Sequence, residues 1–154
     1  MIFQRKAHRV LAVVIALMLL FIWSNSLAGS KQSNALSGWV EKLLKPLLDP
    51  QGKIPAKVFD YEVRKAAHVI EYAILGMLLG WLSAPIKKQG VWLLLFLVLM
   101  TALIDETIQI FTGRTSQVQD VWIDFFGAGT GILLVSLVMK VAKTRKRAYN
   151  AKEV

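Results

Sequence analysis

Long apolar runs alternate with short polar segments along this chain of 154 residues. Four of the runs are long enough to cross a bilayer, which takes about 20 mostly apolar residues in a helix. The predicted membrane-spanning helices cover residues 10–27, 66–84, 91–111 and 118–141. The pattern therefore predicts an all-α, polytopic membrane protein that forms one domain over residues 1–154 and ends in a basic cytoplasmic tail at residues 142–154.

The first apolar run has a second interpretation, as a secretory signal peptide. Arg5, Lys6 and Arg9 precede the run, and Ser26-Leu27-Ala28 resembles a signal-peptidase cleavage site. Both interpretations leave residue 30 outside the cytoplasm, so the orientation of the other helices does not depend on the choice.

Charge predicts the orientation of the chain. With both termini in the cytoplasm, that side holds three basic residues before the first helix, two between the second and third helices, and six from Lys140 onward. The outer side holds the other eight basic residues and nine of the ten acids. This asymmetry follows the positive-inside rule. The net charge of +9 thus indicates attraction to anionic lipid, and nucleic acid is not needed to explain it.

The segment between the first two membrane helices has a helical pattern of its own. Apolar residues recur at three- and four-residue steps from Leu36 to Leu48, with charged residues opposite. This predicts an extracytoplasmic amphipathic helix in the outer interface, with Trp39 at headgroup level, which Pro46 or Pro50 shortens or ends. A small extracytoplasmic cap packed on the bundle is the alternative.

Ionisable side chains interrupt the other three membrane helices. Each ion at membrane depth costs at least ~2.5–3.5 kcal/mol, so such residues usually have a function. In the predicted topology the second helix begins, the third ends and the fourth begins on the outer side. Their polar residues then lie at matching depth, which predicts one shared site below Arg114. The members are Lys65, His68, Glu71 and Tyr72 of the second helix, Asp105, Glu106 and Gln109 of the third, and Asp120 and Asp124 of the fourth.

Helical periodicity places most of these residues on common faces. Glu106 lies to one side of its stripe and is the weakest member, while Gly127 and Gly131 continue the stripe of the fourth helix and allow close helix approach. Five acids face two permanent cations and one histidine, so some acids must be protonated, hydrated or paired. The alternative without a ligand is that these side chains only hold the helices together.

At these residues the chain resembles the VanZ-like family of bacterial membrane proteins, named for a teicoplanin-resistance accessory protein. The resemblance rests on K-x-x-H-x-x-E-Y-x-x-L-G from Lys65 to Gly76 and on Asp105, Glu106, Gln109, Phe111, Arg114, Asp120 and Gly127. Ser24 and Ser26 also resemble the family's serine-rich exit from the first helix. Thr112 replaces a usual proline and Asp124 a usual asparagine, so no family role is carried over to Asp124. The resemblance implies a four-helix protein of the cytoplasmic membrane linked to lowered glycopeptide sensitivity.

Three functions compete for the polar site. In the first, it binds or processes an envelope lipid headgroup or lipid-linked precursor. The catalytic candidates are then His68, Glu71 and Asp105, and the binding candidates are Lys65, Tyr72, Glu106, Gln109, Arg114, Asp120 and Asp124. The second function is a cation or proton pathway, which the apolar stretch from Val91 to Met100 disfavours. The third is a non-catalytic envelope partner that makes contact through residues 36–48.

Neither a metal nor a cofactor is expected from the sequence. Cysteine is absent, which excludes thiolate metal sites and a cysteine nucleophile. His68 with Glu71 or Asp105 offers metal-ligand chemistry, but the spacing fits no dedicated zinc motif. No obvious nucleophile is found among the polar residues of the predicted site. The sequence therefore does not decide between an enzyme and a protein that only binds its ligand.

Overall fold

The computed structural model describes residues 2–28, 30–83, 88–114 and 116–151, and all the regular structure among them is helical. The helices are α1 (Ile2–Leu27), α2 (Ser30–Leu48), α3 (Ala56–Leu82), α4 (Lys88–Phe111) and α5 (Val118–Asn150). Of these, α1, α3, α4 and α5 are long and apolar enough to cross a membrane. The predicted all-α fold with four membrane-spanning helices is thus confirmed.

Two of the helices extend well beyond their predicted spans. α3 begins at Ala56 instead of residue 66, and α5 continues to Asn150 instead of ending at residue 141. Both extensions are rich in lysine and arginine. Because these residues lower the hydropathy of a segment, the predicted spans did not include the extensions, although both residue types form helices well. Most of the predicted tail is therefore helix. Residue 84, the predicted end of one span, and residues 152–154 of the tail lie outside the described residues.

The amphipathic segment forms α2, which packs against α3. The ammonium of Lys45 lies 5.8 Å from the centre of the Phe59 ring. Pro46 is accommodated inside the helix, which ends two residues before Pro50. Trp39 is exposed, as are Leu43 and Leu47, while the side chain of Leu36 lies outside the described residues. The location of α2 in the membrane interface stays a prediction.

α3 and α5 cross closely because glycines line the crossing. A Cβ atom added at Gly76 would overlap the backbone of Ala128, and one added at Gly131 would overlap the backbone of Ala73. Small residues allow helix backbones to approach in this way inside a membrane. The close approach predicted from the small residues of α5 is confirmed.

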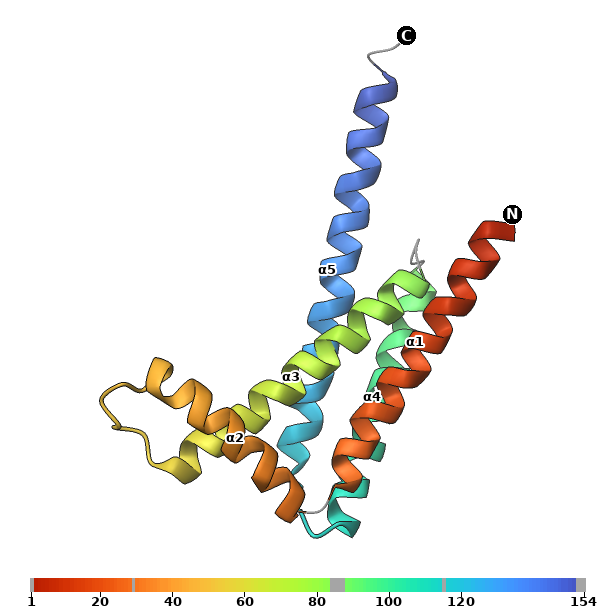
Figure 1. Cartoon of the computed structure of the whole chain (residues 1–154). Coiled ribbons are helices and arrows are strands. Elements are labelled where there is room, and N and C mark those ends of the chain that lie inside the picture. Colours follow the sequence, from red (N-terminus) through yellow and green to blue (C-terminus); the bar gives the residue numbers. More distant parts are fainter. Residues whose placement is uncertain (1, 29, 84–87, 115, 152–154) are drawn as a thin grey trace.

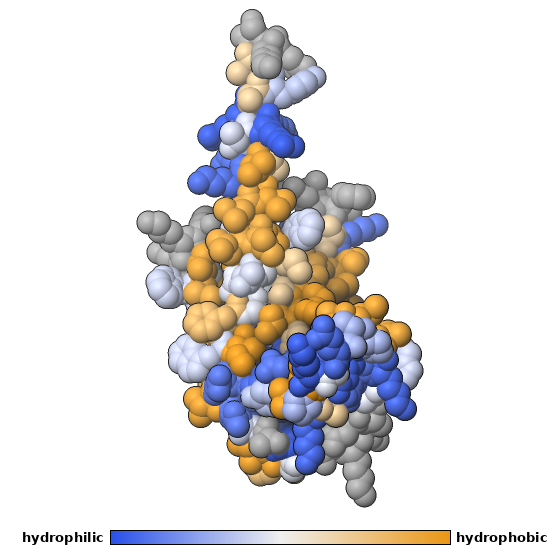
Figure 2. Space-filling model, turned by 90° about the vertical axis from the view of Figure 1, so that its left-hand side faces the viewer, coloured by the Kyte–Doolittle hydropathy of each residue, from blue (hydrophilic) through white to orange (hydrophobic). Residues whose placement is uncertain are grey.

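The helices together bury one apolar core. It includes Ile22 of α1, Leu75 of α3, Val98 of α4 and Ala128 of α5. The N-terminal end of α1 and the C-terminal end of α5 point to the same end of the molecule, and the turn between α4 and α5 lies at the other end (Figure 1). Figure 2 shows apolar side chains over the middle of the visible face and hydrophilic ones above and below. This arrangement suits a bundle with lipid around its middle.

Candidate functional site

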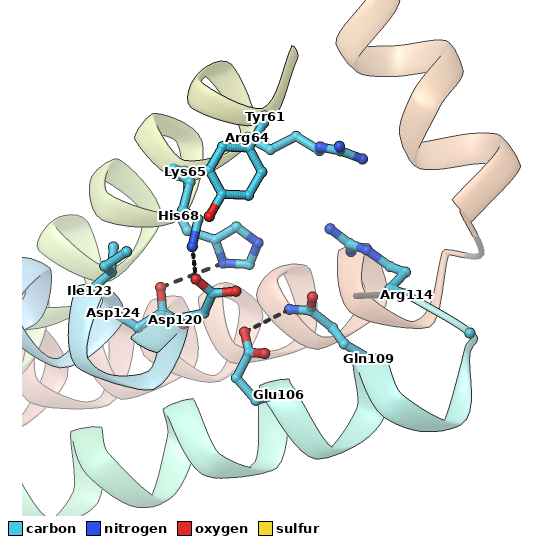
Figure 3. Close-up of a pocket in the computed structure, with 11 residues that line it drawn as sticks. Tyr61, Arg64, Lys65, His68, Glu106, Gln109, Arg114, Asp120, Ile123 and Asp124 are labelled. Atoms are coloured by element: carbon cyan, nitrogen blue, oxygen red, sulfur yellow. Dashed lines mark hydrogen bonds and ion pairs between the residues drawn. The ribbon is translucent and has the colours of Figure 1, made fainter. Parts of the chain in front are cut away.

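A polar cavity of about 250 Å³ lies where α3 begins, α4 ends and α5 begins. Its lining residues are Tyr61, Arg64, Lys65, His68, Glu106, Gln109, Gly113, Arg114, Asp120, Ile123 and Asp124. Figure 3 shows these side chains converging from three helices and the connecting turn. Seven of the ten residues proposed from the sequence therefore share one cavity, although the chain separates them widely.

Lys65 and Asp120 form an ion pair across the cavity, between α3 and α5. The Lys65 ammonium also lies 4.8 Å from the centre of the Tyr61 ring, within reach of a cation–π interaction. Both charged side chains are largely shielded from solvent, with exposed fractions of 16% and 18%. One of the five acids predicted for the site thus has its negative charge balanced by a cation on a different helix.

His68 lies between two buried carboxylates. Its Nδ1 atom is 3.6 Å from Oδ1 of Asp124 and 3.8 Å from Oδ2 of Asp105. Asp105 is fully buried and Asp124 nearly so, with 1% of its side chain exposed. Three helices thus contribute one side chain each to a single cluster, in which His68 and Asp124 line the cavity and Asp105 lies behind them.

Glu106 is fully part of the site, although the helical stripe made it the weakest candidate. Its carboxylate accepts hydrogen bonds from Gln109 Nε2 at 3.1 Å and from Ser116 Oγ at 2.5 Å. Gln109 Nε2 also lies 3.2 Å from Oδ2 of Asp105. The amide of Gln109 therefore links two acids of α4 that point in different directions on the helix.

The end of α1 forms a further wall that the candidate set from the sequence did not include. Ser26 Oγ donates a 2.6 Å hydrogen bond to Asp105, and Asn25 Nδ2 donates one of 3.2 Å to Glu71. The Asn25 carbonyl accepts a hydrogen bond from the Arg114 guanidinium. The signal available in the sequence was the polar run Ser24-Asn25-Ser26 at the end of an apolar helix.

Two arginines stand together at the cavity. Burial lowers the pKa of Arg114, and the nearby positive charge of Arg64 lowers it further. Figure 3 shows both guanidinium groups on the side of the cavity away from the carboxylates of Asp120 and Asp124. Arg64 was not among the residues proposed from the sequence, because it precedes the apolar part of its helix. The cavity therefore has a cationic side and an acidic side.

Three proposed residues lie behind the cavity instead of lining it. Asp105 and Tyr72 are fully buried among the helices, and Glu71 faces Asn25 of α1. Of the three catalytic candidates, only His68 reaches the cavity.

A family comparison matches most of this structure. The model of the family described as VanZ/LLP1 matches residues 10–139, which include the greater part of each of the four membrane helices and all the residues that line the cavity. The chain belongs to the VanZ/LLP1 family. No curated protein and no solved structure matches it. The VanZ/LLP1 match confirms the resemblance found in the motifs of α3, α4 and α5.

Proposed function

We propose that this VanZ/LLP1 protein is a multi-pass protein of the bacterial cytoplasmic membrane with both termini in the cytoplasm. The strongly basic end of α5 supports this orientation because positive segments stay on the cytoplasmic side. The cavity lies toward the opposite end of the bundle, near the turn between α4 and α5 (Figure 1). It then opens at the outer leaflet, where lipid headgroups and lipid-linked envelope precursors are the available ligands.

The proposed ligand is the anionic headgroup of such a lipid or precursor. The observation that carries this proposal is the presence of both Arg64 and Arg114 in the lining of one cavity, where the charge of Arg64, itself ion-paired with Asp60, still lowers the pKa of Arg114. An anion between them would relieve this repulsion, and guanidinium groups bind phosphate through two parallel hydrogen bonds. At about 250 Å³ the cavity suits a headgroup more than a whole lipid, whose chains would stay in the bilayer.

The acidic side of the cavity suits the rest of a headgroup. Glu106 and Asp120 offer acceptors for hydroxyl or amine groups, and His68 is placed to give or take a proton. Binding or processing an envelope precursor here would change what a glycopeptide such as teicoplanin meets at the outer surface. Lowered glycopeptide sensitivity would follow from that change.

Loss of the Arg114 charge tests the proposal directly. We expect Arg114→Gln to weaken binding of short-chain phosphatidylglycerol or of a short prenyl diphosphate about 10-fold, since a hydrogen bond to a charged group contributes roughly 1.5 kcal/mol. The measurement is a titration of the purified protein in detergent with each compound. The two compounds distinguish a phospholipid from a prenyl-linked precursor as the ligand.

Lys57→Gln is the matched control, because Lys57 is an exposed cation of α3 that does not line the cavity. This variant should bind both compounds as the unaltered protein does. Equal affinity in the Arg114→Gln and Lys57→Gln proteins would contradict a headgroup site at the cavity.

A further inference from the structure

We propose that His68, Asp105 and Asp124 form a binding site for one divalent transition-metal ion, of which Zn²⁺ and Mn²⁺ are the best-matched examples. The site lies at the floor of the cavity, between α3, α4 and α5. It does not depend on the headgroup proposal, because it is formed entirely by side chains of the protein. The sequence shows no metal motif here because each ligand comes from a different helix.

The distances from His68 to the two aspartates suit ligands of one shared metal ion better than they suit hydrogen bonds. Hydrogen bonds between an imidazolium and a carboxylate measure about 2.7–2.9 Å, well below the 3.6 and 3.8 Å found here. Two ligand atoms at about 2.0–2.2 Å from one tetrahedral ion lie roughly 3.3–3.6 Å apart. One donor atom from each residue lies within 4.8 Å of the other two. A small contraction would bring all three onto one ion.

Unsatisfied polar atoms point to the same place. Both carboxylate oxygens of Asp124 and the Nδ1 atom of His68 are buried without a hydrogen-bond partner among the described residues. A buried carboxylate without a partner is costly in a low-dielectric interior. A metal ion would supply the missing partner to His68 Nδ1 and to one oxygen of Asp124 at once.

The other protein contacts are arranged as in an established metal site. Asp105 receives hydrogen bonds from Ser26 and Gln109, which fix the direction of its carboxylate. Such outer contacts orient metal ligands and raise their affinity. His68 and Asp124 line the cavity, so a fourth coordination position would face it and remain open to water or to a ligand oxygen.

Charge and donor type select the class of ion. With a neutral imidazole, the two charges of a divalent ion balance those of the two aspartates, and they remove two of the three excess negative charges of the predicted site. An imidazole ligand favours Zn²⁺ and related transition metals, whereas Mg²⁺ and Ca²⁺ prefer oxygen ligands alone. Mg²⁺ is therefore the natural comparison ion.

The test is metal binding by the full-length protein in detergent, without added lipid. After chelation and reloading, we expect about one equivalent of Zn²⁺ or Mn²⁺ per chain by elemental analysis, with at least 10-fold weaker binding of Mg²⁺. The separate variants His68→Gln and Asp124→Asn should each lose at least 100-fold in Zn²⁺ affinity, which is more than outer contacts usually contribute. Asp124→Asn changes almost no volume, and circular dichroism verifies that each variant is folded.

The control variants are His8→Ala, which removes the other histidine of the chain, and Glu62→Gln, which removes an exposed acid of α3. Both should bind the metal ions unchanged. Failure of the unaltered protein to bind Zn²⁺ or Mn²⁺, or equal binding by all four variants, would overturn the proposal. Because lipid is absent from this assay, its outcome is separate from that of the headgroup titration.

Discussion

Three acids of this site each have a partner on a neighbouring helix. Asp120 pairs with Lys65, Asp105 accepts from Ser26, and Glu71 accepts from Asn25. Such pairing is required because an acid left without a partner in a low-dielectric interior loses its hydration without compensation. The arrangement explains how a chain with so many intramembrane acids can still form a tight bundle.

Removal of the Ser26 hydroxyl should therefore destabilise the bundle. Ser26→Ala leaves one oxygen of the buried Asp105 without its donor, which costs roughly 1–3 kcal/mol. The measurement is the thermal unfolding midpoint of the purified protein in detergent. Ser24→Ala is the control, because Ser24 is exposed and donates only to the Phe21 carbonyl of its own helix. A lower midpoint for both variants equally would contradict a special role for Ser26.

Among the elements, the crossing of α3 and α5 determines where the site forms. Gly76 and Gly131 bring the two backbones together, and the same two helices carry Lys65, His68 and Asp124 toward one another. α1 then closes the site through the end that carries Ser26. A change in the α3–α5 spacing should thus affect the stability of the bundle and the cavity together.

Gly131→Ala tests this dependence at the element scale. The added methyl group would overlap the backbone of Ala73, and overpacking of this kind typically costs about 1–3 kcal/mol. We expect a lower unfolding midpoint and weaker binding of the anionic probes. Gly129→Ala is a close control, because a Cβ there meets nothing within 4 Å. Equal stability of the two variants would mean that the crossing tolerates a wider spacing.

For the whole molecule, the distribution of charge governs the proposed placement in the membrane. The basic end of α5 and the polar cavity lie at opposite ends of the bundle, with apolar side chains covering the visible middle (Figure 2). Exposed aromatic and aliphatic residues such as Trp92, Phe96 and Leu133 face outward from the membrane helices. They suit contact with lipid chains.

Single-cysteine labelling tests this orientation cleanly, since the natural chain contains no cysteine. We expect Gln51→Cys to react with an impermeant maleimide in intact cells and Lys146→Cys to react only after the cells are opened. Both positions are exposed, and neither lines the cavity. Labelling of Lys146→Cys in intact cells would reverse the proposed orientation and move the cavity to the cytoplasmic side.

The sequence by itself determined the membrane helices and most of the polar set. Hydropathy and helical periodicity are local properties, so four spans and the separate stripes that carry His68 and Asp124 could be predicted without a fold. Positive charge at the end of α5 likewise predicted the orientation. The charged first turns of α3 were missed because hydropathy does not distinguish a polar helix extension from a loop.

Only the tertiary structure decided which polar groups meet. The pairing of Lys65 with Asp120 depends on the rotation and crossing of α3 and α5, which no local pattern specifies. Glu106 joined the site because Gln109 and Ser116 reach it, although its helical angle argued against it. Asn25 and Arg64 also belong to the site, although neither was among the site residues predicted from the sequence. The sequence thus placed the polar residues at one depth, and helix packing made them into a cavity with opposed charges.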